Sequence, residues 1–128
     1  MKRNETIAVI LMLLALFGVV GGILGIEKVR RSRLYTVELT AREPDKGNWY
    51  PRTITVPLGQ PVTMMIRNVE TVSHGFALPD FNVAVREIKA GHVKTVEFTP
   101  DKVGKFTFFC TVWCSPRHQE MTGTLIVE

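Results

Sequence analysis

The 128-residue sequence has few of the residues that usually carry catalysis, with only two cysteines and three histidines. It contains no internal repeat or low-complexity tract, which argues against a repeat architecture. After residue 33, no segment has the periodicity of an amphipathic helix, and this argues against a helical domain. No general base, nucleophile or open metal position is recognisable. We therefore expect no catalysis by this chain on its own.

An excess of positive charge is also missing from most of the chain. The formal net charge is +4, yet up to Arg33 there are six basic residues against two acidic ones, and beyond it ten against ten. The whole excess therefore lies beside the N-terminal apolar segment, where it can meet anionic lipid headgroups. A domain without net charge has no electrostatic footprint for nucleic acid, so we expect no nucleic-acid partner.

Only one apolar run is long enough to cross a membrane. Residues Ile7 to Ile26 include no charged side chain, and twenty such residues in a helix span roughly 30 Å. A secretory signal peptide is the alternative, but the stretch that starts at Gly25 has no small-x-small cleavage site. The sequence predicts an uncleaved anchor with a basic juxtamembrane segment over residues 1–33, followed by one domain over residues 34–128.

The pattern after the anchor changes to alternating polar and apolar residues, which is typical of strands. Turn sequences such as Leu78-Pro-Asp and Thr99-Pro-Asp separate the alternating segments. Many short strands without an amphipathic helix predict an all-β, antiparallel sandwich behind the transmembrane helix. The predicted strands cover residues 35–41, 52–56, 61–67, 93–98, 105–109 and 122–127.

One short stretch concentrates metal-binding side chains. Cys110 and Cys114 are separated by three residues, three more separate Cys114 from His118, and two separate His118 from Met121. The stretch lies between two predicted strands, where several side chains can converge. Soft thiolate and thioether donors with imidazole suit copper, whereas hard cations prefer carboxylates. A disulfide between the cysteines is an alternative, as is zinc, which has little use for a thioether.

This string resembles the ligand loop of the dinuclear copper (CuA) domain of cytochrome c oxidase subunit II and nitrous oxide reductase. The resemblance extends over about 90 residues from Tyr35 onward, and it is most similar to the short, single-helix branch of heme-copper oxidase subunits II. Further matching segments are Asn48-Trp-Tyr-Pro51, Val56-Pro-Leu-Gly59, Ser73-His-Gly-Phe76 and Met121-Thr-Gly-Thr124.

The resemblance implies a cupredoxin-like Greek-key β-sandwich that binds two copper ions. Both cysteines would bridge the coppers, each histidine would cap one, and the thioether and one backbone carbonyl would be weak axial donors. Many oxidase subunits have a glutamate at the position of Val112 that also reaches a magnesium ion. A valine side chain cannot, so only its carbonyl role carries over. The implied ligands are His74, Cys110, Val112, Cys114, His118 and Met121.

The implied function is electron transfer as subunit II of a heme-copper oxidase, beside subunit I. The donor would be cytochrome c or a small copper protein. Four basic residues after the anchor and two before it favour a cytoplasmic domain. Copper electron transfer with exported or membrane-bound donors favours the periplasmic or extracellular side, which we expect. Alternatives are a mononuclear blue-copper protein, a copper-delivery protein and an anchored protein serving a nitrogen-oxide reductase.

Overall fold

The computed structural model describes residues 2–32 and 35–128, which form two compact units. The first unit is helix α1 (Arg3–Ser32). Its segment Arg3–Val29 is long and apolar enough to cross a membrane, at roughly 40 Å for 27 residues. This confirms the predicted N-terminal apolar helix. The boundary predicted between residues 33 and 34 lies outside the described residues and stays a prediction.

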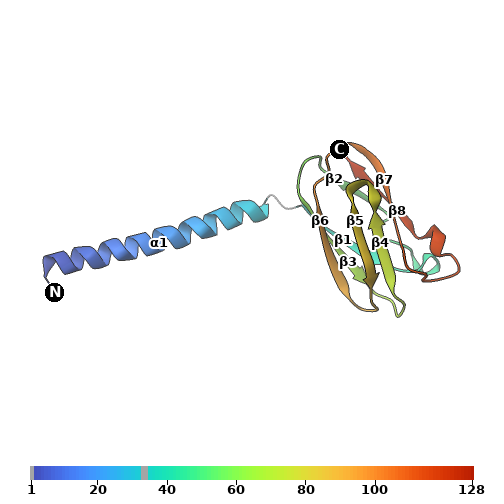
Figure 1. Ribbon diagram of the computed structural model, residues 1–128, viewed down its shortest axis with the longest axis horizontal. Coiled ribbons are helices and arrows are strands. Elements are labelled where there is room, and N and C mark those ends of the chain that lie inside the picture. Colours follow the sequence, from blue (N-terminus) through green and yellow to red (C-terminus); the bar gives the residue numbers. More distant parts are fainter. Residues whose placement is uncertain (1, 33–34) are drawn as a thin grey trace. The chain divides into compact units, whose positions relative to one another are not determined.

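The second unit is a β-sandwich of two sheets, as predicted (Figure 1). One sheet has the strand order β1-β3-β6 and the other has the order β2-β8-β7-β4-β5. The strands are β1 (Tyr35–Ala41), β2 (Thr53–Val56), β3 (Val62–Asn68), β4 (His74–Leu78), β5 (Val83–Ile88), β6 (Val93–Phe98), β7 (Gly104–Phe109) and β8 (Thr122–Val127). Three short 3-10 helices lie in the connections: η1 (Pro44–Lys46), η2 (Pro79–Phe81) and η3 (His118–Glu120).

The expectation of a purely antiparallel sandwich is wrong. Strand β1 pairs in parallel with β3, and β2 pairs in parallel with β8, whereas the remaining pairs are antiparallel. Each parallel pair joins strands whose connection crosses to the other sheet. Alternation along a single strand reports only which face is buried, so it cannot distinguish the two pairing directions.

Two strands were not predicted. Strand β4 is buried at four of its five positions, so it lacks the alternation of a strand with one face in water. Strand β5 is exposed at three of its six positions and begins just after Asn82, the residue that caps the Pro79–Phe81 3-10 helix, so the sequence gives no clear signal for its start. Both lie at the edge half of the larger sheet, and β4 carries the first residue of the candidate site.

The core beneath the site is aromatic. Trp49, Phe76 and Phe108 are almost fully buried and pack with ring centroids 5.6–5.9 Å apart. Gly123 makes room for this cluster, because an added Cβ would lie 2.2 Å from the Phe108 ring and 2.9 Å from the carbonyl oxygen of Arg52. The aromatic cluster therefore depends on a glycine in β8.

Replacing this glycine should destabilise the domain. Gly123→Ala forces Phe108 and the backbone at Arg52 apart, and overpacking of this kind costs about 1–3 kcal/mol. The measurement is urea unfolding of the full chain in detergent, followed by tryptophan fluorescence. Gly91→Ala is the control, since nothing lies within 4 Å of that position and only its positive φ is strained. Equal stability of Gly123→Ala and the wild type would contradict this packing.

Candidate metal centre

The candidate ligands gather at one end of the sandwich. The segment between β7 and β8, residues 110–121, lies there beside the turn that carries η1 (Figure 1). The two segments are joined by Arg117, which pairs with both Asp45 and Glu120. This end of the domain therefore holds the whole Cys-His-Met string in a loop between strands, as its sequence predicts.

The two thiols are buried and unpaired. Cys110 directly follows β7 and is 4% exposed, and Cys114 is 8% exposed. Both are free cysteines, which removes the disulfide alternative in this structure. The donor atoms of His74, Cys110 and Cys114 all lie within 4.8 Å of one another.

Each sulfur has its own imidazole and its own weaker donor. Cys110 Sγ lies 3.8 Å from Nδ1 of His74 and 3.3 Å from the carbonyl oxygen of Val112. Cys114 Sγ lies 3.6 Å from Nδ1 of His118 and 3.7 Å from Sδ of Met121. The structure thus brings all six predicted ligands together around two sulfurs.

His74 is placed differently from what its polar neighbours in sequence indicate. By itself, a histidine after this polar segment would be expected in a surface loop. His74 is instead the first residue of β4 and is fully buried. The following Gly75 donates its N–H to Cys110 Sγ at 3.4 Å. A Cβ there would lie 2.1 Å from Thr111 Oγ1 and 3.1 Å from Val112 Cγ2, so glycine allows the ligand loop to lie against β4.

Trp49 and Asn48, neither of which is a predicted ligand, hydrogen-bond to the backbone at the C-terminal end of the ligand loop. Trp49 donates its indole N–H to the carbonyl oxygen of Met121 at 3.1 Å. Asn48 donates its amide to the carbonyl oxygen of Glu120 at 2.8 Å. The backbone N–H of Cys110 also donates to the Met121 carbonyl, at 3.1 Å. The matching segment Asn48–Pro51 is the only sequence signal that points to this support.

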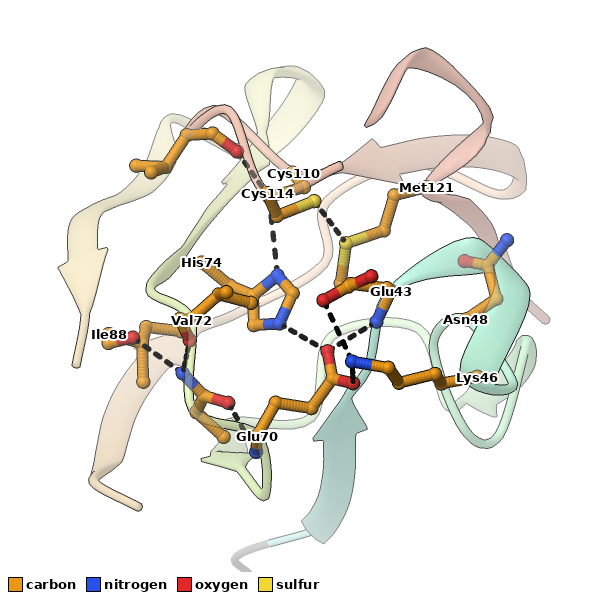
Figure 2. Close-up of polar contacts among 12 residues, drawn as sticks. Glu43, Lys46, Asn48, Glu70, Val72, His74, Ile88, Cys110, Cys114 and Met121 are labelled. Carbon is orange, nitrogen blue, oxygen red and sulfur yellow. Dashed lines mark hydrogen bonds and ion pairs between the residues drawn. The ribbon is translucent and has the colours of Figure 1, made fainter. Parts of the chain in front are cut away.

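A buried carboxylate that no sequence pattern indicates also contacts the site. Glu70 Oε2 lies 3.1 Å from Nε2 of His74, on the opposite side of the ring from Cys110 (Figure 2). Glu70 is four residues before His74 in the turn between β3 and β4. A glutamate in a polar turn is ordinarily solvated, so no local pattern marks this one as buried.

Burial and hydrogen bonds set the protonation of these groups. Burial lowers the pKa of His74, and the Glu70 carboxylate offsets this only in part. Burial opposes ionisation of Glu70, but the backbone N–H of Glu43, with His74 and Lys46, lowers its pKa below the ordinary value. Burial, together with the Cys110 sulfur, raises the pKa of the Cys114 thiol to about 11. The metal-free site therefore combines a neutral imidazole with a protonated Cys114.

The donor set fits copper. Two thiols, two imidazole Nδ1 atoms and a thioether are soft or borderline ligands, and the described residues place no carboxylate oxygen against either sulfur. Zinc would be satisfied by two thiolates and two imidazoles and leaves the Met121 thioether unexplained. Met121 is fully buried with its sulfur aimed at Cys114, which favours copper.

Comparison with known proteins gives one family and several relatives. The Cupredoxin-like domain family matches residues 9–127. A nitrous-oxide reductase of Ralstonia nicotianae is 33% identical over 103 residues, covering 78% of this chain and 15% of that protein. A cytochrome c oxidase subunit 2 of Thermus thermophilus is 32% identical over 80 residues, covering 62% of this chain and 58% of that protein. The chain therefore spans less than two thirds of either relative.

The fold also matches solved structures. The periplasmic domain of subunit II of cytochrome oxidase from Bradyrhizobium japonicum superposes with a TM-score of 0.60 at 23% identity. The match covers 73% of this chain and 83% of that one. At this identity the likeness concerns the fold, which agrees with the sandwich described above.

Metal loading should release a proton from Cys114. Because the pKa of this thiol is about 11, it is protonated at pH 7, and a metal binds the thiolate. The apparent affinity for Cu(I) should therefore rise with pH, by about tenfold per unit for each proton released. An indicator dye counts the protons released when Cu(I) is added, and Cu(I) titrations at several pH values give the apparent affinity. Cys114→Ser is the control, because it has no thiol proton to release at this position. Affinity independent of pH between 6 and 8 would contradict the assignment.

Proposed function

The chain belongs to the Cupredoxin-like domain family, and from this premise we propose that it carries electrons through a dinuclear copper centre. The residues that would hold the two copper ions are His74, Cys110, Val112, Cys114, His118 and Met121. The observation that carries the proposal is the division of donors between the two sulfurs. Each thiol contacts a different imidazole and a different weak donor. A single copper bound by His74, Cys114, His118 and Met121 would leave the buried Cys110 without a role.

Copper in such a site supplies a one-electron couple shared over two ions and two thiolates. The chain contributes a stiff frame that changes little between oxidation states. Cys110 is tied by its backbone to Met121, and Met121 is tied to Trp49. Because these ties are buried, the ligands are held in place whether or not the charge of the centre changes.

Electrons are proposed to enter near His118. This ring is half-buried, and the neighbouring Trp113 is 71% exposed with its ring centroid 6.1 Å from that of His118. An exposed tryptophan is a common contact in transient interfaces. Beyond residue 33, basic and acidic residues are equal in number, so a donor would dock by short-range contact rather than long-range steering. Phe76, the aromatic residue two positions after His74, offers no docking surface, because it is fully buried.

The proposed place of the chain is subunit II of a heme-copper oxidase, next to subunit I. The Thermus thermophilus and Bradyrhizobium japonicum proteins support this reading, since both are named as subunit II. Helix α1 would hold the chain in the membrane, with the copper domain on the periplasmic or extracellular side. Cytochrome c or a small copper protein would be the donor. Copurification of a heme subunit with the tagged native chain tests the assignment.

A second role is favoured by a different observation. The Ralstonia nicotianae nitrous-oxide reductase matches more of this chain than the Thermus thermophilus subunit does, 78% against 62%. An anchored copper domain that passes electrons to a separate nitrogen-oxide reductase is therefore the alternative. In that case, the native chain would copurify with no heme subunit.

The purified full chain should bind two copper ions and be purple, with a near-infrared band. Cys110→Ser should abolish this spectrum, because one of the two thiolates that would hold the copper ions is lost. The measurement is copper analysis per chain together with the absorption spectrum. One copper per chain, the deep blue of a single thiolate and a harmless Cys110→Ser substitution would support a mononuclear site instead.

Replacing Met121 should retain copper and raise the reduction potential. Met121→Leu preserves the buried volume but removes a weak donor that favours the oxidised state. If that donor contributes on the order of 1 kcal/mol, the shift is roughly 40 mV for one electron. Redox titration measures it. Val112→Ala is the control, since only its carbonyl oxygen faces Cys110. Loss of copper in folded Val112→Ala would count against the ligand set.

A further inference from the structure

We infer that Glu70 is a positioning residue for the metal centre: its carboxylate fixes the His74 ring with Nδ1 toward the sulfurs, and its negative charge lowers the reduction potential. This inference rests on the proposed function. No resemblance or motif assigns a role to Glu70, and its part follows from the contacts in the turn between β3 and β4.

Asn68 builds the turn that carries Glu70. Its side chain is almost fully buried, and its Nδ2 donates to the carbonyl oxygens of Val72 at 2.7 Å and Ile88 at 2.9 Å. Its Oδ1 accepts the backbone N–H of Glu70 at 2.9 Å. One asparagine therefore ties both sides of the turn to β5 and orients the Glu70 backbone.

The Glu70 carboxylate is held from three directions. Its side chain is 6% exposed. Oε2 accepts the backbone N–H of Glu43 at 2.6 Å and faces Nε2 of His74 at 3.1 Å. Oε1 forms an ion pair with Nζ of Lys46 at 3.3 Å but has no hydrogen bond of good geometry. A carboxylate held in this way has little freedom to leave the imidazole.

This contact determines which nitrogen of His74 can bind a metal. A carboxylate only accepts, so Nε2 must carry the hydrogen, and Nδ1 keeps the lone pair that faces Cys110. A carboxylate behind an imidazole also makes the imidazole a stronger donor. A stronger donor stabilises the more positive, oxidised centre, and the potential falls.

The other imidazole lacks this arrangement. His118 is half-buried, and among the residues that the structure describes no carboxylate hydrogen-bonds to its ring. The negative charge therefore acts from one side of the centre. Lys46 opposes it from the surface, since its side chain is 57% exposed and also pairs with Glu43 at 3.0 Å. Removal of Glu70 and removal of Lys46 should shift the potential in opposite directions.

The test uses four substitutions in the full chain in detergent. Glu70→Gln retains an oxygen that can accept from His74 but removes the charge, and we expect copper to be retained at a higher potential. Glu70→Ala removes both, and loss of such a partner typically weakens metal affinity about 10- to 100-fold. Lys46→Met should lower the potential by a smaller amount. Glu38→Gln is the charge-matched control, because Glu38 is 60% exposed and paired with Arg67 on the sheet surface.

A readout without metal tests the tautomer directly. In the copper-free wild type, nitrogen NMR of labelled histidine should show His74 with its hydrogen on Nε2. In Glu70→Ala the His74 signal should shift toward a mixture of tautomers, while Glu38→Gln leaves it unchanged. A wild-type hydrogen on Nδ1 would overturn the inference, whatever the metal content of the protein.

The outcomes separate this inference from the proposed function. A wild type that binds one copper refutes the dinuclear centre, yet the tautomer measurement still decides the role of Glu70. A wild type with two coppers and an unchanged potential in Glu70→Gln refutes the electrostatic role alone. Shifts of the same sign in Glu70→Gln and Lys46→Met would indicate a merely structural effect and would also overturn the inference.

Discussion

Two free thiols buried side by side are the constraint on which the rest of the site depends. Burial and the neighbouring sulfur keep the Cys114 thiol protonated in the metal-free protein. The thiolate form becomes favourable only when a bound cation compensates its negative charge. Each sulfur contacts an imidazole and either a carbonyl oxygen or a thioether, all of which can bind a metal, and Cys110 Sγ also accepts the N–H of Gly75. The sandwich supplies the stiffness, because both ends of the ligand loop continue into paired strands of one sheet.

The two histidines have different surroundings, although both present Nδ1 to a sulfur. His74 is sealed inside the domain, with a fixed carboxylate behind it. His118 lies at the edge of the loop beside an exposed tryptophan. This asymmetry would suit a metal centre that receives electrons near His118 and whose reduction potential is adjusted by the carboxylate behind His74. In this account Glu70 and Trp113 have separate tasks, so their substitution should affect different measurements.

Much of the fold followed from sequence, and the reasons for the failures are physical. Alternation located β1 and β6 to the residue, because each has one face toward the core. It failed for β4, which is buried on both faces, and it could not distinguish parallel from antiparallel pairing. The Cys-His-Met string could be recognised from the local spacing of its residues alone. His74 could be joined to it only through the family resemblance, and Glu70 was missed because its burial depends on contacts with Glu43 and Lys46 from a distant turn.

The central claim of the proposed function is that Cys110 and Cys114 would together hold two copper ions that share one unpaired electron. The most direct measurement is the electron paramagnetic resonance spectrum of the copper-loaded chain with one electron removed from the fully reduced site. The account predicts hyperfine splitting from two equivalent copper nuclei. Splitting from a single copper nucleus would contradict it.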